Sequence, residues 1–138
     1  MKEPSDFYTL KGYERTNHSH ITSSMEDYLE MICRMRAQNE TVRINTLAGL
    51  LNVRPSSASK MITNLKNAGL VDFQPYGYIQ PTDKGNELGQ YLLYRHHLLN
   101  EFLCLINHTD NELEQVEKIE HFINEKTLKN IELFLASQ

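Results

Sequence analysis

The chain has 138 residues, of which 40% are hydrophobic and 23% charged. This composition is ordinary for a globular protein and excludes a largely disordered chain, and the length excludes a large enzyme scaffold. No apolar run approaches the roughly 18 residues that a membrane helix needs, and residues 1–22 lack the apolar core of a secretion signal. We therefore expect a cytoplasmic protein without a membrane segment.

The formal net charge of −4 is distributed unevenly along the chain. Residues 34–70 contain six bases against one acid, whereas residues 107–138 contain seven acids and three bases. A basic segment suits the phosphates of a nucleic acid, and an acidic segment suits cations. The two halves are therefore expected to have different functions.

The first regular element is expected after an N-terminal extension, residues 1–22, whose role the sequence does not indicate. Apolar residues recur at three- and four-residue steps over residues 24–38, which predicts a helix with one buried face. Ser23 and Glu26 match a capping box, in which a hydroxyl and a glutamate three residues later bind the free N–H groups of the first turn.

A second helix is expected over residues 42–51. A third begins at Pro55, whose missing N–H costs nothing in a first turn, and ends at Gly69. A further capping-box pattern at residues 109–112 opens the fifth helix. The expected ranges of the two strands and the last three helices are 70–74, 78–82, 83–106, 109–122 and 125–136.

Two helices followed by a β-hairpin form the order of a winged helix-turn-helix. We therefore predict a mainly α fold with a small β-wing, in which residues 23–82 form a DNA-binding domain and residues 83–138 a helical domain. The apolar surface on the last three helices exceeds what a small domain can bury alone, which favours self-association.

The start of the third helix is the candidate DNA-reading element. Small hydroxylated residues there allow close approach to the major groove, and neighbouring bases can contact phosphates. The alternative is a solvated helical face without a ligand. The candidate DNA-contacting residues are Arg54 just before the helix, Pro55, Ser56, Ser57, Ser59 and Lys60 in the helix, and Tyr76 and Tyr78 in the hairpin.

Acidic side chains stand at helical spacing on the first predicted helix and, together with a histidine, on the fifth. A further histidine, His96, lies midway along the apolar fourth helix. Taken singly, they are also explained as solvated acids or as a core histidine. Clustered carboxylates need compensating protons or cations, so convergence of the three helices would create a divalent-ion site. Oxygen and imidazole donors without sulfur suit Mn²⁺ or Fe²⁺. The candidate metal ligands are Asp27, Glu30, His96, Glu117, Glu120 and His121.

Four motifs resemble those of the diphtheria-toxin-repressor family of metalloregulators, most closely its manganese-responsive branch. They are SMEDYLE at 24–30, PSSASKM at 55–61, YRHHLL at 94–99 and VEKIEH at 116–121. The resemblance spans about residues 23–136. Iron-type members carry sulfur-bearing side chains at the positions of Asp27 and Glu120. Many of them also have a third, SH3-like domain, which the resemblance to the manganese branch does not lead us to expect here. The extension over residues 1–22 departs from the manganese branch.

The resemblance implies a homodimeric, metal-dependent transcriptional repressor that binds a palindromic operator in double-stranded DNA and controls metal-ion uptake genes. It also implies that the second domain is a metal-binding and dimerisation domain, and that the six candidate ligands hold two Mn²⁺ ions per subunit. Substitute ions would be Fe²⁺, Co²⁺, Zn²⁺ or Cd²⁺.

Three alternatives stay open. One is an iron-responsive regulator of the same family, and another is a winged-helix regulator gated by a small organic ligand or by none. The third is a di-metal enzyme in a helical bundle, against which stand the absence of HExxH, of paired ExxH motifs and of an evident nucleophile and base. No catalytic residue and no small-molecule substrate are therefore expected.

Overall fold

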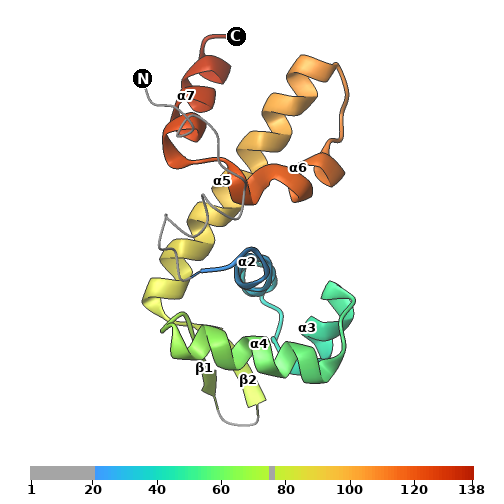
Figure 1. Ribbon diagram of the computed structural model, residues 1–138, viewed down its shortest axis with the longest axis vertical. Coiled ribbons are helices and arrows are strands. Elements are labelled where there is room, and N and C mark those ends of the chain that lie inside the picture. Colours follow the sequence, from blue (N-terminus) through green and yellow to red (C-terminus); the bar gives the residue numbers. More distant parts are fainter. Residues whose placement is uncertain (1–20, 75–76) are drawn as a thin grey trace, which may run out of the picture.

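The computed structural model describes residues 21–74 and 77–138, and one long helix joins its two helical parts (Figure 1). The predicted mainly α fold with a small β-wing is confirmed. No helix in these ranges is long and apolar enough to cross a membrane. The elements are α2 (Ser23–Ala37), α3 (Ile44–Leu51), α4 (Pro55–Asn67), β1 (Val71–Gln74), β2 (Tyr78–Pro81), α5 (Asp83–Asn107), α6 (Leu113–Ile119), the 3₁₀ helix η3 (Glu120–Phe122) and α7 (Glu125–Ala136).

The first part is the expected winged helix-turn-helix. α3 ends at Asn52, which adopts a left-handed conformation, and α4 starts at Pro55. β1 and β2 pair antiparallel, with Val71 opposite Pro81. The second helix was predicted to begin at residue 42, but α3 begins two residues later because the Val42 carbonyl accepts a hydrogen bond from the backbone N–H of Ile79 in β2.

The predicted capping box at the start of α2 is wrong by one residue. Thr22 is the N-cap, and its hydroxyl accepts a hydrogen bond from the backbone N–H of Met25 at 3.1 Å. With the cap at Thr22, Glu26 is no longer in the position that reaches back to the cap residue. Its carboxylate is therefore available for contacts with other helices.

The predicted fifth helix is also shorter than the sequence pattern indicates. Its first residue is Leu113, and the residue before it, Glu112, accepts hydrogen bonds from the Thr109 hydroxyl and the Asn107 amide. At Glu120 the α-helix gives way to η3, a tighter helix with three residues per turn. Glu120 and His121 thus lie on a 3₁₀ turn.

α5 connects the two hydrophobic cores. Its N-terminal half contributes Leu92 to the core of the winged helix, and its C-terminal half contributes Leu99 and Leu103 to a second core with Val116 and Leu128. The helix also crosses α2 closely: a methyl group at Gly89 would overlap Cys33. This contact fixes the distance between α2 and α5.

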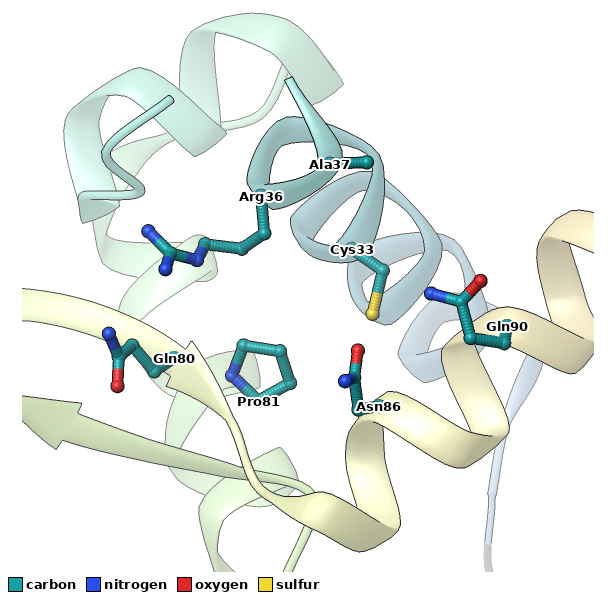
Figure 2. Close-up of a pocket in the computed structure, with 7 residues that line it drawn as sticks. All are labelled: Cys33, Arg36, Ala37, Gln80, Pro81, Asn86 and Gln90. Atoms are coloured by element: carbon teal, nitrogen blue, oxygen red, sulfur yellow. The ribbon is translucent and has the colours of Figure 1, made fainter. Parts of the chain in front are cut away.

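A pocket of about 330 Å³ lies beside this crossing, between α2, β2 and α5 (Figure 2). The Cys33 side chain points into the space between α2 and α5, and burial raises the pKa of its thiol to about 11. A protonated, buried thiol acts as a small apolar side chain. The remaining lining residues are Arg36, Ala37, Gln80, Pro81, Asn86 and Gln90.

Gly85 shows how closely α5 meets the wing, because a Cβ there would overlap the backbone carbonyl of Leu70. Backbone cannot move aside as a side chain can, so Gly85→Ala should lower the free energy of unfolding by about 3 kcal/mol. Chemical denaturation measures this. The control is Gly49→Ala in α3, where nothing lies within 4 Å and a gain of about 0.5–1 kcal/mol is expected. Equal stabilities for the two variants would contradict the close approach.

Candidate metal centre

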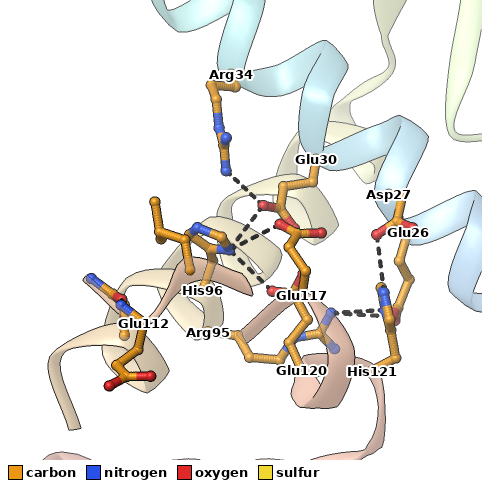
Figure 3. Close-up of polar contacts among 12 residues, drawn as sticks. Glu26, Asp27, Glu30, Arg34, Arg95, His96, Glu112, Glu117, Glu120 and His121 are labelled. Atoms are coloured by element: carbon orange, nitrogen blue, oxygen red, sulfur yellow. Dashed lines mark hydrogen bonds and ion pairs between the residues drawn. The ribbon is translucent and has the colours of Figure 1, made fainter. Parts of the chain in front are cut away.

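Three parts of the chain bring the six candidate ligands together (Figure 3). α2 supplies Asp27 and Glu30, α5 supplies His96, and α6 with η3 supplies the other three. Figure 3 shows the side chains from these elements pointing toward one another. They form two groups of potential donor atoms, each with all its atoms within 4.8 Å of one another.

The first group, here called the His96 cluster, consists of Glu30, His96, Glu117 and Glu120. Its centre is the Nδ1 atom of His96, which lies 3.4 Å from Glu30 Oε2, 3.7 Å from Glu117 Oε2 and 3.3 Å from Glu120 Oε1. All four residues except Glu117 are buried. Three carboxylates therefore surround one imidazole in a largely water-excluded site.

The second group, the His121 cluster, consists of Asp27, Glu120 and His121. The Nε2 atom of His121 lies 3.0 Å from Asp27 Oδ1, and the other ring nitrogen, Nδ1, lies 2.7 Å from Glu26 Oε1. Glu120 belongs to both clusters, and its side chain is 0% exposed. One buried carboxylate thus links two adjacent groups of donors.

Two oxygens of this centre have no hydrogen-bond partner among the described residues. They are Oε1 of Glu30 and Oε2 of Glu120, both buried. A buried acceptor without a donor is costly, and a cation satisfies it directly. Both clusters offer oxygen and imidazole nitrogen without sulfur, the donor set that suits a hard or borderline divalent ion. The residues present fit such an ion.

Protons partly compensate the carboxylates when no cation is bound. Burial, reinforced by Glu120, raises the pKa of Glu30 to about 7. Burial likewise raises the pKa of Glu117. Hydrogen bonds to Asp27 and Glu26 raise the pKa of His121 to about 10, and a hydrogen bond to Glu120 raises that of His96. At neutral pH the metal-free centre therefore holds protons that a cation must displace.

Because these bound protons must leave when a cation binds, cation affinity depends on pH. A raised pKa means that His121 is protonated below about pH 10, so its Nε2 proton must leave before the lone pair can bind a metal. Affinity for Mn²⁺ should fall as the pH is lowered, with about one or more protons released per chain at pH 7. Calorimetry in two buffers of different ionisation enthalpy measures the release. His121→Gln should release about one proton fewer; identical heats in both buffers for the wild type would contradict the assignment.

Three charged residues that were not among the candidates also contact the centre. Arg34 donates a hydrogen bond to Glu30 Oε2 at 2.7 Å, and the buried Arg95 donates to Glu26 Oε1 at 3.1 Å. The sequence offered one signal, because Arg95 directly precedes His96 on α5. Its burial, however, appears only when α2 packs against α5.

The candidate DNA-contacting residues form an exposed strip at the start of α4. Ala58 is buried and anchors the helix to the core, whereas the residues around it face outward. In the wing, Tyr78 is exposed and the Arg43 guanidinium lies 4.3 Å above its ring, which adds a base that the candidate list did not include. Tyr76 lies outside the described residues. The exposed candidates on and beside α4 are Arg54, Pro55, Ser56, Ser57, Ser59 and Lys60.

Two family models match the chain in succession. The first, "Iron dependent repressor, N-terminal DNA binding domain", matches residues 20–79, and the second, "Iron dependent repressor, metal binding and dimerisation domain", matches residues 82–137. The chain belongs to the iron-dependent repressor family. The metalloregulator family indicated by its four motifs is thereby confirmed, and within this family the DNA-binding half precedes the metal-binding and dimerisation half.

Relatives in this family are named as regulators of transcription. The HTH-type transcriptional regulator MntR of Oceanobacillus iheyensis is 36% identical over 111 residues, which cover 80% of this chain and 76% of the relative. The structure of the manganese regulator SloR superposes with a TM-score of 0.71 at 25% identity. A manganese-dependent transcriptional repressor in complex with manganese superposes with a TM-score of 0.68 at 29% identity.

These superpositions cover 83% and 81% of this chain but only 54% and 52% of the two solved chains, so the chain spans about half their length. Membership of the iron-dependent repressor family makes the chain a metal-dependent transcriptional repressor and not an enzyme. The di-metal enzyme considered from the sequence is therefore excluded.

Proposed function

We propose that this protein is a Mn²⁺-responsive repressor that acts as a cytoplasmic homodimer on a palindromic operator and controls genes for metal-ion uptake. The observation that carries the proposal is Glu120, a fully buried carboxylate shared by the His96 and His121 clusters. Relatives named for manganese support the choice of ion. In this proposal residues 23–82 bind DNA, residues 83–138 bind metal and dimerise, and residues 1–22 have no assigned role.

We assign the six candidate ligands to two ions per subunit: each cluster would hold one ion, and Glu120, which belongs to both clusters, would be a donor in each. A bound divalent cation supplies positive charge that neutralises the converging carboxylates. Because intrinsic affinity rises along the first-row metals, Fe²⁺, Co²⁺ and Zn²⁺ are expected to bind as well, and Cd²⁺ is a further substitute. Selectivity for Mn²⁺ then depends on coordination number and geometry. The oxygen-rich donor set suits a hard cation such as Mn²⁺.

The positions of the ligand residues explain how cation binding would affect DNA binding. Asp27 and Glu30 belong to α2, which packs in the winged helix, whereas Glu117 and Glu120 belong to the second part. Without compensation, repulsion between these carboxylates separates α2 from α6 and η3. With compensation the two parts are held together, and in a dimer this fixes the separation of the two α4 helices near the roughly 34 Å between successive major grooves.

The change in net charge on cation binding also favours DNA binding. Two divalent cations per chain carry four positive charges, equal in size to the formal net charge of −4. A neutral protein is repelled less by the phosphate backbone than an acidic one, and its basic α4 surface then dominates the approach to DNA.

Binding isotherms with a palindromic operator at fixed salt test the proposal. We expect affinity to fall by about 100-fold when a chelator removes the metal and to return with Mn²⁺. Recovery with Fe²⁺ but not with Mn²⁺ would replace the proposal by the iron-responsive alternative. Affinity indifferent to the chelator would favour a regulator gated by an organic ligand or by none. A variant that lacks residues 1–22 shows whether the extension affects binding.

Lys60, exposed in α4, is expected to contact a phosphate in each half of the operator. Lys60→Ala should weaken binding to all sequences alike, and it should reduce the slope of log affinity against log salt by about two, because a dimer loses two such contacts. Isotherms at several salt concentrations measure the slope. Lys129→Ala removes an equally charged, exposed residue from α7 and should leave the slope unchanged. The same slope in the wild type and Lys60→Ala would remove Lys60 from the interface.

A further inference from the structure

Glu26 lies at the edge of the metal centre without belonging to either donor group. Because Thr22 caps α2, the Glu26 carboxylate extends across to α5 and η3. Its Oε1 atom lies 3.1 Å from Arg95 Nη2 and 2.7 Å from His121 Nδ1 (Figure 3). One oxygen therefore connects three elements that are far apart in the sequence.

Arg95 is the buried positive charge that pairs with Glu26. The residue is 3% exposed, and a buried guanidinium needs a counter-charge. Among the described residues that counter-charge is Glu26, whose Oε1 atom pairs with Nη2, and the Nε atom of Arg95 has no hydrogen-bond partner there. A guanidinium keeps its protons in proteins and can only donate hydrogen bonds, so Arg95 holds the Glu26 carboxylate by donating to its Oε1 atom.

An ionised carboxylate can accept a hydrogen bond but cannot donate one. The Nδ1 atom of His121 lies 2.7 Å from Glu26 Oε1 and 3.4 Å from Arg95 Nη2. The shorter of the two contacts is with an acceptor oxygen, so the geometry favours an Nδ1–H group that donates to Glu26. This leaves Nε2, on the side of Asp27, as the nitrogen that can offer a lone pair. Metal-binding histidines in proteins are generally oriented by such a carboxylate on the other ring nitrogen.

We propose that Glu26, held by Arg95, is a positioning residue that fixes the ring orientation and tautomer of His121 for the ion of the His121 cluster. The His96 cluster has a different charged neighbour, Arg34, which pairs with Glu30. The contacts of Glu26 among the described residues are instead with Arg95 and His121. Loss of Glu26 therefore lowers the affinity for the ion of the His121 cluster and leaves the affinity for the other ion unchanged. This inference rests on the proposed metal function and deepens it.

The test compares Mn²⁺ titrations of the full-length wild type, Glu26→Gln and Glu26→Asp by calorimetry. Glu26→Gln should weaken one of the two binding events by about 10–100-fold and leave the other unchanged, and Glu26→Asp should recover part of the loss. Glu114→Gln is the matched control, because it removes one negative charge from an exposed position on α6. It should bind both ions as the wild type does.

A spectroscopic readout separates positioning from a general structural effect. In the Zn²⁺-loaded wild type, long-range ¹H–¹⁵N spectra should show His121 protonated at Nδ1, whereas Glu26→Gln should show a mixture of tautomers, because an amide can donate as well as accept. Equal weakening of both ions, or wild-type affinity and tautomer in Glu26→Gln, would overturn the inference. A wild type that binds no Mn²⁺ would instead overturn the proposed function itself.

Discussion

Glu120→Gln is expected to abolish the response of DNA binding to Mn²⁺. Because the Glu120 carboxylate belongs to both clusters, the substitution removes a donor from both of the proposed ion sites at once. We expect apparent Mn²⁺ affinity to fall by at least about 100-fold, more than for a residue that only orients a ligand. Calorimetry and operator isotherms measure the two effects. Glu117→Gln, which alters only the His96 cluster and whose side chain is 52% exposed, should have the smaller effect.

Stability of the metal-free protein distinguishes this loss from unfolding. Glu120 Oε2 is buried and has no hydrogen-bond partner in the described part of the chain, so the neutral amide should leave the metal-free protein at least as stable as the wild type. Mn²⁺ at about 100 times its dissociation constant should stabilise the wild type by about 2.7 kcal/mol and the variant by almost nothing. A Glu120→Gln protein that Mn²⁺ still stabilises to the same extent would refute the proposed role of Glu120 as a ligand in both clusters.

Placing charge on the apolar surface of the second part is expected to separate the dimer and to cost most of the affinity for the operator. Leu133 on α7 is 63% exposed and Ile106 at the end of α5 is 49% exposed, within the part that matches a dimerisation domain. Linking two DNA-binding units gains about 10²–10⁴ in affinity, so the variant Ile106→Glu with Leu133→Glu should lose a comparable factor.

Sedimentation of this double variant should give the mass of one chain. Mn²⁺ binding should persist, because all six candidate ligands lie in a single chain. Leu50→Glu is the control: Leu50 is 53% exposed but lies on α3, and its substitution should leave the dimer intact. A double variant that still sediments as a dimer would place the interface elsewhere.

Helical periodicity was sufficient to predict most elements, whereas the candidate ligands were also chosen from the place of His96 in an apolar helix and from the family resemblance. Residues three and four apart lie on one face of a helix, so Glu117, Glu120 and His121 could be grouped from spacing alone. Convergence of these residues with Asp27 and His96 could not be derived from spacing, since it depends on how α2 packs against α5.

The missed features all depend on packing or on choices between near-equal local structures. Thr22 and Ser23 are both good caps, and nothing local decides between them, yet the choice determines what Glu26 contacts. Arg95 resembles a solvated base in the sequence and is buried only in the assembled fold. The change from α6 to η3 at Glu120 likewise has no signature in the apolar pattern.

The position of Gly89 on α5 limits which length changes this helix can tolerate. Gly89 meets Cys33 of α2, and His96 follows seven residues later, which is close to two full turns. Inserting or deleting a single residue between them would rotate the imidazole by about 100° relative to the α2 crossing. Homologues that vary in length should therefore place their insertions and deletions in the connections that flank α5, and leave this two-turn stretch uninterrupted.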